Sequence, residues 1–340
     1  MMWRAGLKWL FLIIGTTIGA GYASGRELWE FFGHESVLAI MIFIALFMIS
    51  CHVILSVSHQ LKTVHYLPVL ETLLGKRMSL LYDFMIILYL FTTTAVMYAG
   101  SGAALEAFRI PYFYGIFISA FLVIILFVWR SDGVVRINAL LIPILIVLLL
   151  VTLIYFLLSQ EQVFDVNWQR QSNWKAGFVF TSLNILPLVA VLAAIGSKIN
   201  HRGEIWIASV GSAFLLGGIT LIYNESLIHV AEELLYIEIP LFAILKHYPS
   251  FMMIMMTLLL WLAIYTTAVS GLLGLTSRLH SRMPLPWWLF ALILTLLMLP
   301  ITFFGFSNLV AFLYPLYGVA NLYLLAALLY YPFAKKRSNE

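Results

Sequence analysis

The chain has 340 residues, of which 63% are hydrophobic and only 10% are charged. Soluble domains carry about 25% charged residues, so this composition excludes an ordinary soluble protein and requires lipid as the solvent. The single cysteine, Cys51, excludes a disulfide framework and a multi-cysteine metal site, and a net charge of +4 by itself gives no support for a nucleic-acid partner.

Ten apolar segments follow one another, each long enough to cross about 30 Å of hydrocarbon as a helix. They lie near residues 7–32, 36–58, 79–105, 112–130, 136–158, 176–199, 205–224, 251–277, 286–304 and 308–332. If both termini are cytoplasmic, fourteen of the 19 Lys and Arg residues fall on the cytoplasmic side. We therefore predict an all-α, multi-pass protein of a bacterial cytoplasmic (inner) membrane, with residues 1–340 as one transmembrane domain.

The first segment is interrupted at its centre by a run of small residues, GTTIGAGYASG over 15–25. Glycine costs about 1 kcal/mol relative to alanine inside a helix, and unpaired backbone groups cost several kcal/mol more in lipid. Such a break survives only where it lines a protected cavity or a binding site. We predict that Ala20, Gly21, Tyr22 and Ser24 contact a substrate; for Tyr22, ordinary packing is the alternative.

Glu27 is the carboxylate nearest this break. Because a charge within the membrane is costly, it indicates a functional role, either binding a cationic solute or carrying a proton. The alternative is structural, since Ser24-Gly25-Arg26-Glu27 has the spacing of a capping box. A resident carboxylate at a helix N-terminus would compete with a substrate carboxylate, which favours an amine-bearing or neutral solute.

Three further side chains in segments 2 and 3 are candidates for the site or for the interface. Tyr98 could line the same cavity, with ordinary packing as the alternative. His52 and His59 are seven residues apart and share one helix face, but no third ligand is in register with them. For these two we predict packing or interfacial roles rather than metal binding. Trp206, near a segment end, is predicted to be an interfacial anchor.

Ten segments divide into two halves of five, near 5–158 and 176–334, and an odd number per half gives the halves opposite orientations. Segment 6 carries Ser182, Asn184 and Pro187 at its centre. Proline removes a backbone donor, so we predict that segment 6 is also discontinuous and that Ser182 and Asn184 contact the substrate. A simple proline kink is the alternative. Residues 225–250 are predicted to form an amphipathic helix over the outer mouth.

The string GTTIGAGYASGRELWEFF resembles the opening of the YkvI-like bacterial membrane proteins, and the ten-segment pattern extends the resemblance through the chain. These proteins resemble distant members of the amino acid–polyamine–cation superfamily, which has the LeuT-type fold. That resemblance implies a sodium site between the break in segment 1 and the middle of segment 8. Its ligands would be the carbonyls of Gly15, Ile18 and Ala263 and the hydroxyls of Thr266 and Thr267.

Two considerations bear on this sodium site. The two threonine hydroxyls could simply donate to carbonyls one turn earlier, as membrane hydroxyls often do. Some proton-coupled relatives carry a lysine of segment 5 at this position. Segment 5 of this chain, INALLIPILIVLLLVTLIYFLL, has no ionisable side chain, which favours sodium.

The chain contains no H-E-x-x-H, G-x-S-x-G, P-loop or dinucleotide-binding signature, so we predict neither an enzyme nor a resident cofactor. The predicted function is secondary active transport of a small organic solute, an amino acid or amine-like compound, coupled to sodium by alternating access. A proton-coupled transporter of the same fold and a non-transporting sensor or scaffold are alternatives, and a channel is less favoured. The expected partners are the solute and the bilayer; the sequence does not define the solute or the oligomeric state.

Overall fold

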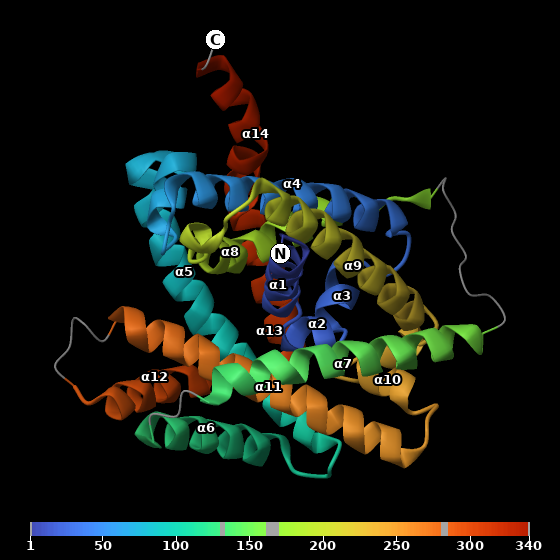
Figure 1. Cartoon of the computed structure of the whole chain (residues 1–340). Coiled ribbons are helices and arrows are strands. Elements are labelled where there is room, and N and C mark those ends of the chain that lie inside the picture. Colours follow the sequence, from blue (N-terminus) through green and yellow to red (C-terminus); the bar gives the residue numbers. More distant parts are fainter. Residues whose placement is uncertain (1, 130–132, 161–169, 280–284, 339–340) are drawn as a thin grey trace.

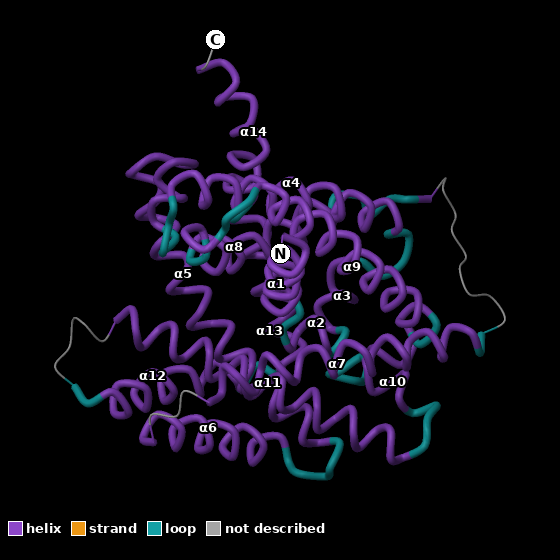
Figure 2. The backbone as a smooth tube through the Cα atoms, in the orientation of Figure 1, coloured by secondary structure: helices purple, strands orange, loops and turns teal. Residues whose placement is uncertain are grey.

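A computed structural model describes residues 2–129, 133–160, 170–279 and 285–338, and these residues form helices, turns and loops without a strand (Figure 2). The helices of the first half are α1 (Met2–Thr17), α2 (Ala20–Ala23), α3 (Arg26–Phe31), α4 (Val37–Leu61), α5 (Leu67–Glu106), α6 (Tyr112–Trp129) and α7 (Gly133–Leu158). Those of the second half are α8 (Ala176–Ala193), η2 (Gly196–Lys198), α9 (Arg202–Ile228), η3 (Ala231–Leu235), α10 (Leu241–Leu245), α11 (Ser250–Leu279), α12 (Trp287–Thr302), α13 (Phe306–Ala320) and α14 (Leu322–Ser338).

Within the described ranges, seven helical stretches are long and apolar enough to cross a membrane. They belong to α4, α5, α7, α8, α9, α11 and the pair α13–α14, while α6 and α12 are shorter apolar helices. The chain is therefore a multi-pass membrane protein. The first predicted segment falls on α1, α2 and α3, and each of the others falls on one or more of these helices. The count of ten crossings and the five-plus-five repeat stay predictions.

The first helix, α1, lies in the middle of the molecule (Figure 1). It packs against α9 and α8, and α4 packs across both of these helices. On the other side, α11 packs against α5, and α6 and α12 cover α5. The break that follows α1 is therefore surrounded by protein rather than by lipid, as broken backbone at membrane depth requires.

The backbone leaves the helical path twice within segment 1. Helix α1 ends at Thr17, residues 18–19 are non-helical, and α2 covers only Ala20–Ala23. Gly25 then takes a φ of 80°, in the left-handed region, before α3 begins. The small residues of the run thus stand where the chain changes direction, and Gly25 supplies a conformation that other residues rarely adopt.

The prediction of a discontinuous segment 6 was wrong. Helix α8 runs from Ala176 to Ala193 with Pro187 inside it, and the chain leaves the helix only beyond Ala193. A membrane helix tolerates proline where neighbouring helices and side chains satisfy the freed backbone groups. Helix α8 is largely buried against α4 and α13, which supply such neighbours.

Residues 225–250 do not form one amphipathic helix. Helix α9 continues through Ile228, and two short turns follow, η3 and α10. Lys246, which follows α10, donates from Nζ to Glu233 Oε2 of η3 over 2.7 Å, and this hydrogen bond lowers the pKa of Glu233. All five residues of α10 are buried, so this turn is part of the protein interior beside the break rather than a surface helix.

Candidate functional site

Side chains and backbone from α9 and α10 hold the broken part of segment 1 in place. The hydroxyl of Tyr223 donates to the carbonyl of Ala23 over 3.0 Å, and the Leu241 amide donates to the carbonyl of Ser24 over 2.9 Å. Ser24 Oγ in turn donates to the Gly21 carbonyl over 2.9 Å. Because these carbonyls have partners, the break is a defined structure.

The end of α1 has a different pattern of hydrogen bonds. The Ile18 amide donates to the Ile14 carbonyl over 2.7 Å, and the Gly19 amide turns back to the Thr17 carbonyl over 2.9 Å. Among the described residues, no backbone amide beyond α1 donates to the carbonyls of Gly15 or Ile18. These are two of the oxygens implied as sodium ligands, and helix C-termini leave such carbonyls available.

The hydroxyls implied as sodium ligands donate to a carbonyl of their own helix. Thr266 and Thr267 in α11 both donate to the Ala263 carbonyl, over 3.1 Å and 2.7 Å. Bonding of this kind, to a carbonyl one turn earlier, is the structural alternative to sodium binding. Helix α11 contacts α2, so these oxygens lie on a helix that borders the break.

Glu27 is buried beside the break, with 6% of its surface exposed. The side chain of Asn184 in α8 lies near its carboxylate, and the Asn184 amide donates to the Phe180 carbonyl over 2.9 Å. A Cβ built on Gly21 would lie 2.9 Å from Glu27 Oε2 and 3.1 Å from the Tyr314 ring, so these three residues converge. Tyr89 of α5 lies close enough for the Glu27 charge to act on it. We call Glu27, Gly21, Asn184, Tyr314 and Tyr89 the Glu27 cluster.

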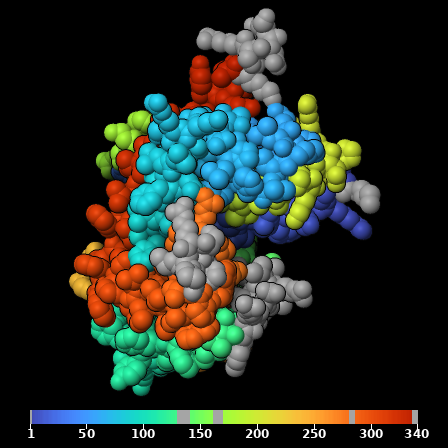
Figure 3. Space-filling model, turned by 90° about the vertical axis from the view of Figure 1, so that its left-hand side faces the viewer, coloured from blue at the N-terminus to red at the C-terminus, as the bar shows by residue number. Residues whose placement is uncertain are grey.

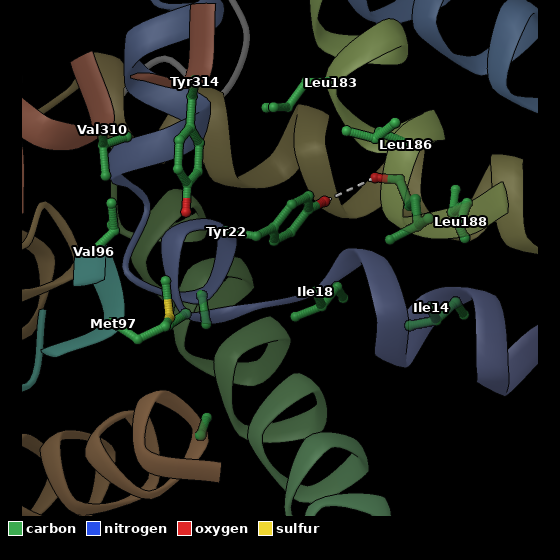
Figure 4. Packing of buried hydrophobic residues seen from close by; sticks show 14 of the residues in the cluster. Ile14, Ile18, Tyr22, Val96, Met97, Leu183, Leu186, Leu188, Val310 and Tyr314 are labelled. Carbon is green, nitrogen blue, oxygen red and sulfur yellow. Dashed lines mark hydrogen bonds between the residues drawn. The ribbon is translucent and has the colours of Figure 1, made fainter. Parts of the chain in front are cut away.

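Four separate parts of the chain build the Glu27 cluster: the break region, α5, α8 and α13. Figure 4 shows Tyr314 directed from α13 toward the ribbon of α2, whereas the Tyr22 ring extends away from that ribbon in another direction. Tyr314 and Tyr89 are also linked through Tyr317, whose ring meets that of Tyr89 edge-on at 5.2 Å. Gly21 therefore lies between the carboxylate and the Tyr314 ring, and aromatic rings attract cations through their faces.

The Glu27 carboxylate has no cationic partner in the part of the chain that the structure describes. The ion pairs found there are Arg26–Glu30, Lys246–Glu233 and Arg278–Asp83. Arg26, although adjacent in sequence, reaches Glu30 one turn away at 3.7 Å. A buried, unpaired carboxylate in a membrane protein is suited to bind a cation or a proton.

The predicted capping box is not formed. The residue that precedes α3 is Gly25, which offers no side chain, and Ser24 Oγ instead accepts from the Arg26 amide over 3.3 Å. The Ser24 amide donates to the Ala20 carbonyl rather than to Glu27. The left-handed turn at Gly25 separates the two members of the box, which leaves Glu27 to face Asn184.

Of the other residues predicted to contact the substrate, some lie at the Glu27 cluster and some hydrogen-bond to neighbouring helices instead. The structure brings Gly21 and Asn184 to Glu27, and Ala20 is buried next to them in the chain. The other hydroxyls are engaged elsewhere. Tyr22 bonds to the Leu216 carbonyl and Thr220, Tyr98 to Thr295, and Ser182 to the Val179 and Gly318 carbonyls.

Reasoning from the sequence alone did not select Tyr314 and Tyr89 as site residues. Nothing distinguishes them in a chain that is 15% aromatic, and each is far from Glu27 in sequence. Only the packing of α13 and α5 around the break identifies them.

We expect Gly21→Ala to impair the site, because the added methyl would meet Glu27 Oε2 at 2.9 Å and the Tyr314 ring at 3.1 Å. The overpacking should cost about 1–3 kcal/mol and should weaken solute binding. Gly19→Ala is the matched control, since a Cβ there meets no atom within 4 Å. Thermal unfolding and solute binding of both variants test this; equal behaviour of the two would contradict the described geometry.

Two bacterial proteins are similar to the chain over nearly its whole length. It is 48% identical to the uncharacterised protein YyaD of Bacillus subtilis (strain 168) over 336 residues, which cover 99% of each chain. It is 22% identical to the uncharacterised membrane protein YkvI of the same organism, over 96% of each chain. A scan against models of known protein families finds no match.

Solved structures of transport proteins share the fold. MhsT in complex with L-phenylalanine has 18% identity and a TM-score of 0.65, over 88% of this chain and 80% of that one. Mhp1 in an inward-facing conformation has 16% identity and a TM-score of 0.61, over 96% and 73%. A sodium-coupled sialic acid symporter has 15% identity and a TM-score of 0.60, over 91% and 73%. These likenesses establish the LeuT-type fold.

Proposed function

Because the chain belongs to the same family as YyaD and YkvI and has the LeuT-type fold, we propose that it is a secondary active transporter of a small organic solute. In this proposal, ten crossings form two inverted repeats in the cytoplasmic membrane, with both termini inside. The solute binds at the break between α1 and α3, and the protein moves it by alternating access. The structural neighbours named for transport support this mechanism by their fold.

The solute carries an amine. The observation that supports this is the buried Glu27 carboxylate, which has Asn184 and tyrosine rings around it and no cationic side chain paired with it in the described ranges. A solute ammonium would supply the missing charge and would contact the Tyr314 ring. An anionic solute would instead be repelled by the carboxylate. Amino acids and simple amines meet this requirement, and dicarboxylates do not.

Sodium is the proposed coupling ion. The carbonyls of Gly15 and Ile18 at the end of α1, together with Ala263, Thr266 and Thr267 of α11, provide the oxygens that a hard cation prefers. The side chains described for α7 bring no ionisable group that could replace the ion. The sialic acid symporter that shares the fold is sodium-coupled, which adds support by analogy.

The function is tested by a thermal-shift screen of the purified protein against amino acids, amines, nucleobases and dicarboxylates, each with and without sodium. A solute at a concentration of 100 Kd raises the free energy of unfolding by about 2.7 kcal/mol, and the apparent melting temperature rises with it. We expect protection by amine-bearing solutes and a larger shift with sodium. Protection by dicarboxylates alone would contradict the proposed substrate class.

Thr266→Ala combined with Thr267→Ala should remove the sodium dependence of solute uptake in proteoliposomes, because it deletes two of the five proposed ligands. Ser277→Ala is the matched control, since Ser277 in the same helix also donates to a backbone carbonyl one turn earlier but is exposed. Unchanged sodium dependence in the double variant would exclude this sodium site.

Proton coupling through Glu27 is a second candidate for the same fold. It is supported by the burial of the carboxylate beside the break, with the polar side chain of Asn184 near it. Uptake driven by a pH gradient in sodium-free proteoliposomes, and lost in Glu27→Gln, would favour this candidate over sodium coupling.

A further inference from the structure

A cavity of about 390 Å³ lies between the end of α4 and the beginning of α9, apart from the Glu27 cluster. These two helices pack side by side (Figure 3). The residues that line the cavity are mostly polar: His52, Ser56, His59, Gln60, Arg202, Ile205 and Trp206. The proposed transport function assigns no role to any of them.

The charged and titratable groups that line this cavity are all basic. Arg202 is exposed, so its guanidinium is available at the mouth. His52 Nδ1 is buried and has no hydrogen-bond partner in the described part of the chain. Lys62 Nζ lies 3.1 Å from His59 Nδ1, which adds a further positive charge beside the cavity. This arrangement is suited to an anion with several acceptor oxygens.

The nearest carboxylate in sequence is directed away from the cavity. Glu204 follows Arg202 by two residues, but it is buried and accepts a hydrogen bond from Trp9 Nε1 of α1 over 3.0 Å. Its charge therefore faces α1, and no carboxylate is among the residues that line the cavity.

The position of the cavity indicates where the anion comes from. Trp206 is 58% exposed, and its ring lies 4.7 Å from that of His52. Exposed tryptophans at helix ends lie at the level of the lipid headgroups. Lys62 and Lys198 are close in sequence to these helix ends, as expected of a membrane surface rich in basic residues.

We propose that the cavity between α4 and α9 binds a phosphate group at the membrane surface. The Arg202 guanidinium makes the main contact, because its planar donors match phosphate oxygens, and His52 and His59 donate the remaining hydrogen bonds. Two sources of phosphate meet this description, the headgroup of an anionic phospholipid and free phosphate. A volume of about 390 Å³ is large enough for a phosphate with its attached glycerol.

The test measures the melting temperature of the full-length protein in detergent. The additions are phosphatidylglycerol, phosphatidylcholine or inorganic phosphate, and native mass spectrometry counts the bound lipid. We expect phosphatidylglycerol to protect the wild type. Its apparent affinity should fall about tenfold or more in the double variant Arg202→Gln, His59→Gln, because hydrogen bonds to a charged group are lost. Arg77→Gln, an exposed arginine of α5, is the matched control and should bind as the wild type does.

The pattern of protection identifies the source. Protection by phosphatidylglycerol alone assigns the site to lipid, and protection by inorganic phosphate as well assigns it to free phosphate. If the double variant does not fold, Arg202→Lys replaces it and should bind more weakly than the wild type, since lysine lacks the planar pair of donors. Equal protection of wild type and variant, or protection by no phosphate source, would overturn the proposal.

Discussion

Glu27→Gln is expected to abolish binding of an amine-bearing solute while leaving the protein folded. Removing one partner of a buried, hydrogen-bonded charge pair costs about 2–5 kcal/mol, which corresponds to a loss of affinity of roughly 30-fold to several thousandfold. The glutamine amide keeps the size of the side chain and removes only its charge. Without solute, the variant should therefore melt at or above the wild-type temperature, because a buried unpaired carboxylate is costly.

Glu30→Gln is the matched control for this experiment. Glu30 lies in the same short helix, but its side chain is 26% exposed and pairs with Arg26 at 3.7 Å. Partly exposed ion pairs are worth about 1 kcal/mol or less, so solute affinity should change by less than about tenfold. Titrating both variants with the solute, with the thermal shift as the readout, compares their solute affinities. Similar losses in the two variants would show that Glu27 has no special role.

Gly25→Ala should produce the largest loss of stability among single glycine substitutions at the break. Gly25 has a φ of 80°, which costs about 1–2 kcal/mol for any other residue. A Cβ there would also lie 2.7 Å from the Tyr223 hydroxyl and 2.8 Å from the ring carbon that bears it. Tyr223 is fully buried and bonded to the Ala23 carbonyl, so it cannot move freely.

The combined strain and overpacking should destabilise the folded protein by about 2–5 kcal/mol. Gly218→Ala in α9 is the control, because a Cβ there meets no atom within 4 Å and alanine is favoured in a helix by about 1 kcal/mol. Thermal unfolding in detergent should show a marked fall for Gly25→Ala and no fall for Gly218→Ala. A Gly25→Ala variant as stable as the wild type would contradict the left-handed turn.

The run of small residues in segment 1 was sufficient to predict where its helix breaks, because seven glycine, alanine and serine residues leave a membrane helix poorly supported. The same reasoning failed for Pro187. A proline lowers the stability of a helix interior locally, but whether the helix breaks depends on the neighbours around it. Those neighbours, α4 and α13, are remote in sequence from α8.

The candidate site was predictable only in part, for a similar reason. Gly21 and Glu27 lie in one short stretch, so sequence reasoning could place both at the break. The spacing of Ser24 and Glu27 fits a capping box, but the positive φ of Gly25 decides against it, and sequence spacing carries no information on that turn. Tyr314 comes from α13 and joins Glu27 only through tertiary packing.

An experimental structure of the protein bound to the most protective solute of the thermal-shift screen is the most direct test of the role assigned to Glu27. We expect the ammonium of the solute within hydrogen-bonding distance of the Glu27 carboxylate, between Gly21 and the Tyr314 ring. A solute bound elsewhere, or one whose anionic group lies nearest Glu27, would contradict the account.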